Sequence, residues 1–296
     1  MHSKHALGVL IFFSALSLVA GDFGPWGAPV NLGAAINSGF GESSATTSKN
    51  GLSLYFQSNR PGVGGFDIYV SQRTSEDASW GPPVMLGPSI NTTAGEMAPA
   101  LSRDEHYLFF ISDRAGGKGD FDLYVSYREF THDDFSWQPA VPITELNTSL
   151  REGMGSYFEN EGGRPQLYFA HGVPGNLDIY MTEQQADGTW GTPTPISELN
   201  TGVDDARPAI RFDGLEIVFF SNRGGDYDLY ASHRNSVSDP WSAPENIGPA
   251  INSAAVEQQP SLSSDGTELY FASNRRGGFG LNDLYVTRRS KRGNHE

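Results

Sequence analysis

Short apolar runs rich in aromatic and β-branched residues recur along the chain, bounded by Gly, Asn and Asp. Such runs are typical of β-strands, and no stretch keeps the period of about 3.6 residues that an amphipathic helix needs. Asp213-Gly214 and Asp265-Gly266 precede two of the runs and predict hairpin turns. The pattern therefore predicts an all-β protein with almost no helix. The runs span 54–56, 108–110, 167–169, 217–220 and 269–271.

Two unrelated sequence markers repeat with one period. The five Trp residues are separated by 54, 57, 53 and 51 positions, and an Asp-(Ile/Leu)-Tyr motif recurs at intervals of 55, 56, 50 and 55. Four-stranded units of roughly 40–50 residues that repeat around an axis are the blades of a β-propeller. The sequence predicts a five-bladed β-propeller with four antiparallel strands per blade. The markers begin at Trp26, Trp80, Trp137, Trp190 and Trp241, and at Asp67, Asp122, Asp178, Asp228 and Asp283.

The frame of the repeat predicts how the ring closes. Each unit opens with a Trp followed by a Pro within three residues, a Trp-x-x-Pro segment in four of the five, yet no such segment follows the last Asp-Leu-Tyr-Val motif at Asp283. We therefore expect Trp26–Leu32 to supply the outer strand of the final blade. The ring is then closed by one N-terminal and three C-terminal strands.

The two ends of the chain differ from the repeats. Residues 7–20 form an apolar run after Lys4 and before Val19-Ala20-Gly21, the pattern of a secretory signal peptide, so we assign 1–21 to a signal peptide, 22–289 to the propeller and 290–296 to a disordered basic tail. No later segment resembles a membrane-spanning helix. We expect a secreted or periplasmic protein, and a monomer.

Composition removes several classes of function. The chain has 296 residues and a formal charge of −15, whereas nucleic-acid binding needs a cationic surface. With no Cys, it has no disulfide, no Cys-ligated metal and no catalytic thiol. We expect no cofactor, apart from a calcium ion considered below.

The fifth unit carries a family resemblance. Pro260–Arg275 reads Pro-Ser-Leu-Ser-Ser-Asp-Gly-Thr-Glu-Leu-Tyr-Phe-Ala-Ser-Asn-Arg, and Gly277-Gly278 and Asp283–Val286 follow. This pattern resembles the TolB-type, WD-repeat-like propeller family of exported bacterial proteins, and the likeness extends over all five units. The resemblance implies a propeller that serves as a docking platform for a protein, an envelope polymer or a small ligand.

One acidic residue precedes the predicted innermost strand of every unit. In a closed ring these residues converge near one mouth of the axial channel, where like charges need a positive partner. One interpretation is a hard-cation site, because carboxylate oxygens suit Ca²⁺. The other is that each carboxylate pairs with an arginine of the Ser-(Asn/Asp)-Arg motifs. The acidic residues are Glu42, Glu96, Glu152, Asp205 and Glu257, and the arginines are Arg60, Arg114, Arg223 and Arg275.

The third unit breaks this pattern. His171-Gly172-Val173 stands where the other units have Ser-(Asn/Asp)-Arg, so Glu152 lacks the matching arginine, although Arg151 or Arg164 offers a substitute. His171 with Glu152 is a candidate for ligand binding, metal binding or acid–base chemistry; the alternative is an ordinary turn histidine. Glu152 and Glu257 are weak metal-ligand candidates.

Three classes of function follow. The regular blades and the family resemblance favour a non-catalytic exported platform that binds a protein or ligand, and we lean against an enzyme. The alternative is a carbohydrate-active enzyme, a glycosidase-like propeller that uses the carboxylates at the channel mouth. The third class is a purely structural envelope protein. Interchangeable carboxylates argue against catalysis, because catalytic groups need not recur in every blade.

Overall fold

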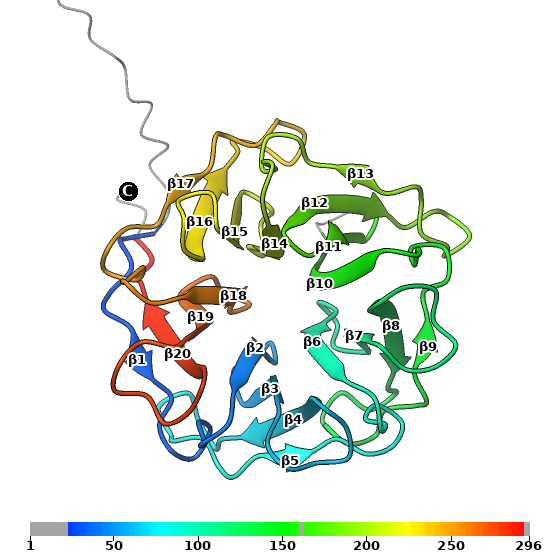
Figure 1. The fold of residues 1–296 in the computed structure, drawn as a ribbon, viewed down its shortest axis with the longest axis horizontal. Coiled ribbons are helices and arrows are strands. Elements are labelled where there is room, and N and C mark those ends of the chain that lie inside the picture. The colour runs from blue at the N-terminus through cyan, green and yellow to red at the C-terminus, as the bar shows by residue number, and fades with distance from the viewer. Residues whose placement is uncertain (1–22, 160–162, 293–296) are drawn as a thin grey trace, which may run out of the picture.

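The structure, a computed structural model, describes residues 23–159 and 163–292. The predicted signal peptide 1–21 and the last residues of the predicted tail, 293–296, lie outside these ranges. Within them the chain forms five separate antiparallel sheets of four strands, arranged in a ring, and no helix (Figure 1). The all-β five-bladed propeller predicted from the sequence is confirmed.

The blades follow one another along the chain. Blade one contains β2 (Glu42–Thr47), β3 (Ser53–Ser58), β4 (Asp67–Gln72) and β5 (Val84–Met85). Blade two contains β6 (Glu96–Leu101), β7 (Tyr107–Ser112), β8 (Asp122–Tyr127) and β9 (Val141–Pro142). Blade three contains β10 (Arg151–Phe158), β11 (Gln166–Val173), β12 (Asn176–Glu183) and β13 (Thr194–Pro195). Blade four contains β14 (Asp205–Ile210), β15 (Glu216–Ser221), β16 (Asp228–His233) and β17 (Glu245–Asn246). Blade five contains β18 (Glu257–Leu262), β19 (Glu268–Ser273), β20 (Asp283–Arg288) and the N-terminal β1 (Val30–Asn31).

The ring closes in blade five as the repeat frame predicts. Strand β1 pairs with β20, with Val30 opposite Val286. Asn31 adds a side-chain bond of 2.8 Å to Asp283. The pairing continues into the start of the predicted tail, because Phe23 bridges Lys291. Closure therefore joins the two ends of the described chain by backbone bonds rather than by side-chain packing alone.

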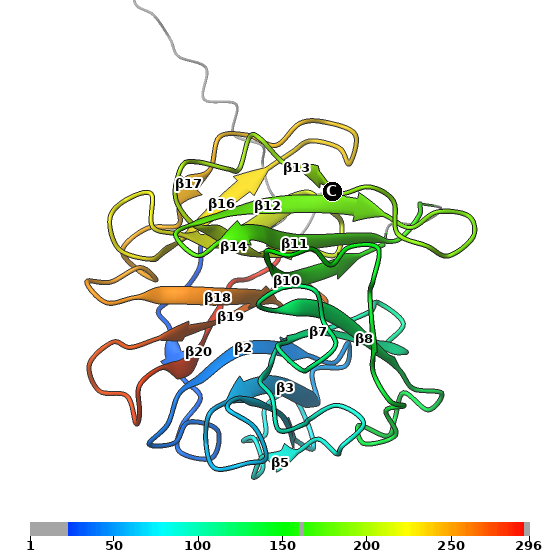
Figure 2. The same ribbon diagram turned by 45° about the vertical axis from the view of Figure 1, so that its right-hand side comes forward.

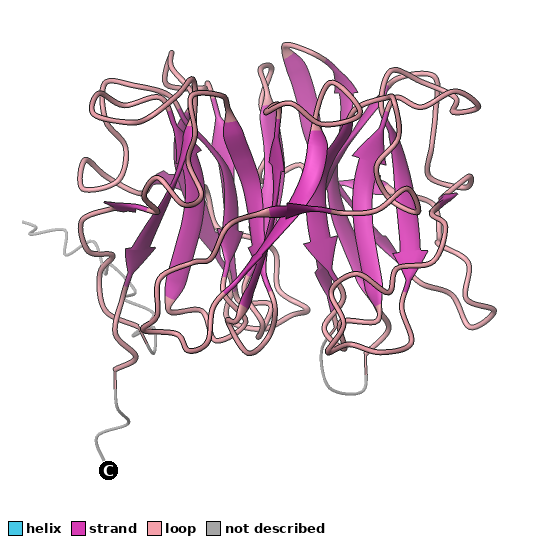
Figure 3. Cartoon of the chain, turned by 90° about the horizontal axis from the view of Figure 1, so that it is seen from below, coloured by secondary structure: helices cyan, strands magenta, loops and turns pink. Residues whose placement is uncertain are grey.

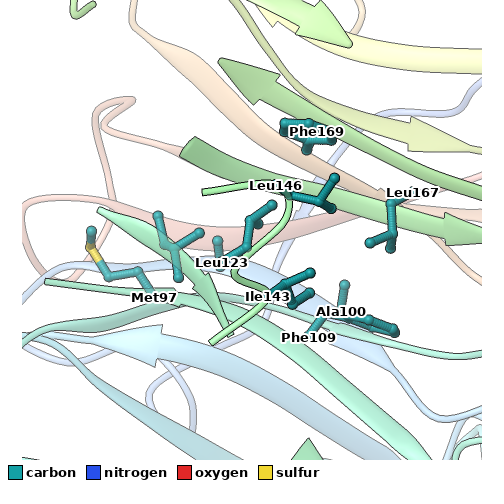
Figure 4. Close-up of a cluster of buried hydrophobic side chains, with 10 residues drawn as sticks. Met97, Ala100, Phe109, Leu123, Ile143, Leu146, Leu167 and Phe169 are labelled. Atoms are coloured by element: carbon teal, nitrogen blue, oxygen red, sulfur yellow. The ribbon is translucent and has the colours of Figure 1, made fainter. Parts of the chain in front are cut away.

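The core lies between neighbouring blades. One cluster joins blades two and three, where Phe109 and Leu123 pack against Leu167 and Phe169 (Figure 4). All four side chains are buried. Each blade is a sheet with two apolar faces, so it is stable only when both faces meet a neighbour. This explains why the apolar runs of the sequence are continuous rather than alternating.

The innermost strands surround the axis (Figures 1 and 2). Their side view shows strands running between two faces that carry the loops (Figure 3). Every innermost strand has an irregular register near its start, two or three residues in for β2, β6, β14 and β18 and four residues in for β10. In four blades the residue at this bulge has a positive φ, at Ser44, Ala98, Arg207 and Gln259. The bulge turns this residue out of the regular alternation of the strand.

The described part of the chain contains no helix of the length and apolarity needed to cross a bilayer.

Candidate functional site

The acidic residue predicted for each unit is found at the start of the innermost strand, or one residue inside it in blade three. None of the five carboxylates has exposed side-chain surface. In blade one, Glu42 accepts bonds from the backbone and hydroxyl of Ser38, at 2.7 and 2.6 Å, and from the Ser58 hydroxyl at 2.8 Å. These bonds tie the carboxylate to the connection that enters the blade and to the next strand.

Four of the five carboxylates also pair with an arginine. The guanidinium–carboxylate distances are 3.0 Å for Arg60–Glu42, 3.1 Å for Arg114–Glu96 and 3.0 Å for Arg275–Glu257. Arg223 makes the same contact with Asp205. In blade one the arginine also donates to the Ile36 carbonyl at 2.6 Å. The arginine interpretation therefore describes blades one, two, four and five, which we call the regular blades.

The contacts give the calcium interpretation no support. The described residues contain no group of three or more His, Asp or Glu placed to hold a metal ion. In the regular blades both carboxylate oxygens already accept protein hydrogen bonds, for example at Glu257. A ligand-binding role for Glu42, Glu96, Asp205 and Glu257 stays a prediction that their burial does not favour.

Blade three replaces the arginine with a histidine. His171 lies opposite Glu152 in the β10–β11 pairing, and its Nδ1 is 3.1 Å from Glu152 Oε1. Thr148 donates its backbone N–H and its hydroxyl to the same oxygen, at 3.2 and 2.7 Å. The other oxygen, Oε2, is buried and has no hydrogen-bond partner among residues 23–159 and 163–292. The structure thus brings the predicted His171 and Glu152 together.

Burial raises the pKa of the Glu152 carboxyl above its ordinary value, although bonds from Thr148 and the nearby His171 act in the opposite direction. The neighbouring Asp178 also has a raised pKa, through burial and the Asp205 carboxylate. The two basic residues that the sequence offered to Glu152 bind elsewhere. Arg151 pairs with Asp120 at 3.2 Å, and Arg164 with Glu183 at 3.8 Å. Neither substitutes for the missing arginine.

A short hairpin accompanies this change. In blade three only Pro174 and Gly175 separate β11 from β12, whereas the regular blades have longer Gly-rich links. Asp204 holds this hairpin: its Oδ1 accepts the backbone N–H groups of Gly175 and Leu177, at 2.8 and 3.0 Å. Its Oδ2 accepts the hydroxyl of Tyr227 at 2.6 Å. Asp204 is a site residue that the sequence analysis missed.

Asp204 and Tyr227 line a cavity of about 270 Å³ at the end of the channel where the innermost strands begin, which we call the proximal cavity; Glu152 and His171 are not among its lining residues. Arg151 and Gly153, the neighbours of Glu152, both line it, as does Ala170 next to His171. The rest of the wall combines amide, carboxylate, aromatic and aliphatic side chains. They include the amides Gln57, Gln258 and Gln259, the carboxylate Asp204, the aromatic Tyr227 and Phe220, and the aliphatic Leu177. Concave sites of this mixed character are typical of small-ligand pockets, of about 300–1,000 Å³.

A second cavity of about 210 Å³ lies where the innermost strands end, and we call it the distal cavity. Arg207 lines both cavities. Its side chain is buried, and its guanidinium crosses from blade four to donate to the Pro99 carbonyl of blade two at 3.0 Å. Arg207 therefore separates the two cavities.

Comparisons with known proteins support the fold. No family model and no curated protein matches the chain. A solved structure described as a TolB from Agrobacterium tumefaciens is 17% identical and covers 92% of this chain and 88% of its own, with a TM-score of 0.54. An α-L-arabinofuranosidase from Lactobacillus brevis is 16% identical, with coverage of 86% and 91% and a TM-score of 0.58. A GH43_1 enzyme from Xanthomonas citri, solved with xylose, is 14% identical, with coverage of 88% and 89% and a TM-score of 0.59.

At these identities the similarity shows the fold, a five-bladed β-propeller that is similar to the TolB structure. It also corrects the expectation of a non-catalytic binding platform, because arabinofuranosidases and other glycosidases outnumber the TolB among these similar structures. The expectation failed because the repeated motif encodes blade packing, so its regularity says nothing about the irregular blade.

Proposed function

We propose that this protein is a carbohydrate-active enzyme that cleaves a glycosidic bond at the proximal cavity, with arabinose- or xylose-containing glycans as its substrates. The observation that carries the proposal is the departure of blade three from the repeat. It leaves Glu152 with a raised pKa and with a buried oxygen that has no partner in the described chain, and the neighbouring Arg151 and Gly153 line the proximal cavity. The similar structures named as arabinofuranosidases and xylose complexes support the choice of glycan.

Glycoside hydrolysis needs a carboxylic acid that protonates the leaving oxygen and a second carboxylate that stabilises the sugar or activates water. A raised pKa keeps Glu152 protonated at a pH where an ordinary Glu is ionised, as such an acid requires. Its flanking residues already line the cavity, and catalytic contacts often tighten only with substrate bound. Asp204, fixed by three donors at the cavity wall, is the second carboxylate.

The proton balance of the reaction follows from these roles. Glu152 gives its proton to the glycosidic oxygen as the bond to the sugar breaks. Water adds to the sugar, and its proton passes to a carboxylate. His171, bonded to Oε1, positions Glu152, and the proton is given from Oε2, which is buried and has no hydrogen-bond partner among the described residues. We also propose that residues 1–21 direct export, which places the enzyme where extracellular glycans occur.

The test is hydrolysis of arabinosides, xylosides and the corresponding oligosaccharides by wild type and Glu152→Gln. We expect wild type to release sugar and the variant to lose about 10²–10⁴-fold in kcat, the usual contribution of a general acid. Activity of the wild type should fall as the pH rises through the raised pKa of Glu152. Glu42→Gln, a ring carboxylate of a regular blade, is the matched control and should keep its activity per folded molecule. Equal activity of Glu152→Gln and wild type would exclude this role.

A further inference from the structure

The distal cavity is not used by the proposed reaction, and Arg207 forms its floor. All five innermost strands or the turns that follow them contribute to its lining. The wall combines hydroxyl groups, such as Thr46, Ser102 and Ser261, with apolar groups, such as Leu101 and Phe212. Phe212 is 44% exposed, which places an aromatic edge at the opening.

The repeat itself shows that the fold does not require Arg207. The residues two positions after the ring carboxylate in the other blades are Ser44, Ala98, Met154 and Gln259, and Ser44, Ala98 and Gln259 lie at the bulge as Arg207 does. Ser44, Ala98 and Gln259 have φ values of 52°, 58° and 57°, and Arg207 has 52°. Neutral side chains therefore fit the same backbone conformation, and only blade four has a cationic residue at this position.

Burial of this cation is costly. Desolvation lowers the pKa of the Arg207 guanidinium to about 9, so the folded chain holds its charge against an unfavourable environment. A buried charge that the repeat does not need is a candidate for a functional group. A guanidinium offers a planar set of donors that matches a carboxylate.

The charges of the distal cavity favour an anion although the whole chain carries −15. Its lining includes three cations, Lys49, Arg103 and Arg207, and two carboxylates, Glu105 and Glu159. Both carboxylates already accept protein donors: Glu105 takes the Lys49 backbone N–H, and Glu159 takes the Tyr157 hydroxyl at 3.0 Å.

From this arrangement we propose that the distal cavity is a second ligand site, which binds a small monocarboxylate with its carboxylate on Arg207. The site is separate from the proximal cavity, and the inference goes beyond the proposed hydrolysis. The wall, with both hydroxyl and apolar groups, suits a ligand whose remaining part is either polyhydroxylated or aliphatic. Both kinds of ligand would be recognised through their carboxylate.

Binding is tested by calorimetry and thermal shift with two matched pairs of probes, galacturonate against galactose and hexanoate against hexanol. We expect at least one carboxylate to bind wild type and its uncharged partner to bind at least tenfold more weakly. The pair that responds identifies the body of the ligand. Absence of binding by both carboxylates at millimolar concentration would overturn the proposal.

Three variants locate the site. Arg207→Gln places in blade four the residue that blade five has at this position, so it should fold and lose carboxylate binding. Ser261→Phe fills the distal cavity and should also lose it, whereas Arg151→Gln, on the proximal cavity, should not. Unchanged binding in Arg207→Gln, or loss confined to Arg151→Gln, would contradict a distal carboxylate site.

Discussion

Blade three and the regular blades differ in the partners of their buried ring carboxylate. Each has a fully buried carboxylate at the start of its innermost strand. The regular blades pair it with an arginine. The Ser at the end of the second strand donates its hydroxyl to the carboxylate in blades one, two and five, whereas in blade four this Ser only accepts a bond from the arginine. Blade three uses His171 and leaves Oε2 of Glu152 without a described partner.

The difference separates structural carboxylates from a reactive one. A buried carboxylate that forms an ion pair with an arginine and accepts hydrogen bonds from its own blade fixes the local geometry. A buried carboxyl whose pKa is raised, and whose second oxygen has no hydrogen-bond partner in the described chain, costs stability and is a candidate for a reactive group. Position in the repeat is therefore a poor guide to function, and the pattern of partners is a better one.

The largest stability effect is expected in a regular blade. Arg223→Ala removes the cation from Asp205, whose side chain is fully buried, and should lower the free energy of unfolding by about 1–3 kcal/mol. Urea denaturation measures the change. Arg276→Ala, at an exposed position in the matching link of blade five, is the control and should change stability by about 0.5 kcal/mol or less. Equal stability of Arg223→Ala and wild type would show that the pair is not structural.

A smaller effect of opposite sign is expected in blade three. Because the pKa of Glu152 is raised in the folded chain, the folded state holds its proton at a pH where the unfolded state has lost it. Its contribution to stability therefore falls as the pH rises above the ordinary Glu value. Glu152→Gln cannot ionise, so its stability does not fall in this way. In thermal melts the melting temperature of the variant should therefore rise relative to that of wild type as the pH goes from acidic to neutral.

The matched variant Glu42→Gln should instead be less stable than wild type, because it breaks the pair with Arg60. If Glu152→Gln and Glu42→Gln lost stability equally across that pH range, the distinction between blade three and the regular blades would fail.

The repeat made much of the fold and part of the site predictable. Two markers with one period define five blades, and the missing last Trp-x-x-Pro segment predicts the β1–β20 pairing. The ring carboxylates and their arginines stand out because both recur. His171 stands out because it interrupts that recurrence, and its contact with Glu152 follows from strand pairing.

Asp204 and Arg207 could not be predicted from the repeat. The residues equivalent to Asp204 are Gly41, Gly95, Arg151 and Val256, so no repeated chemistry marks the position. Its role depends on the short hairpin of blade three, a contact between blades. Arg207 acts through a bulge that turns its side chain across the channel, and a bulge leaves no reliable mark in the sequence. One available signal was that Arg207 is the single charged residue at its place in the repeat.

A crystal structure of Glu152→Gln with an arabino- or xylo-oligosaccharide decides whether the irregular blade forms the glycan site. The variant should retain the substrate uncleaved. We expect a sugar ring in the proximal cavity, with its glycosidic oxygen near residue 152 and contacts to Asp204 and Tyr227. A saccharide bound only at the distal cavity or on the outer strands, with the proximal cavity free of sugar, would contradict it.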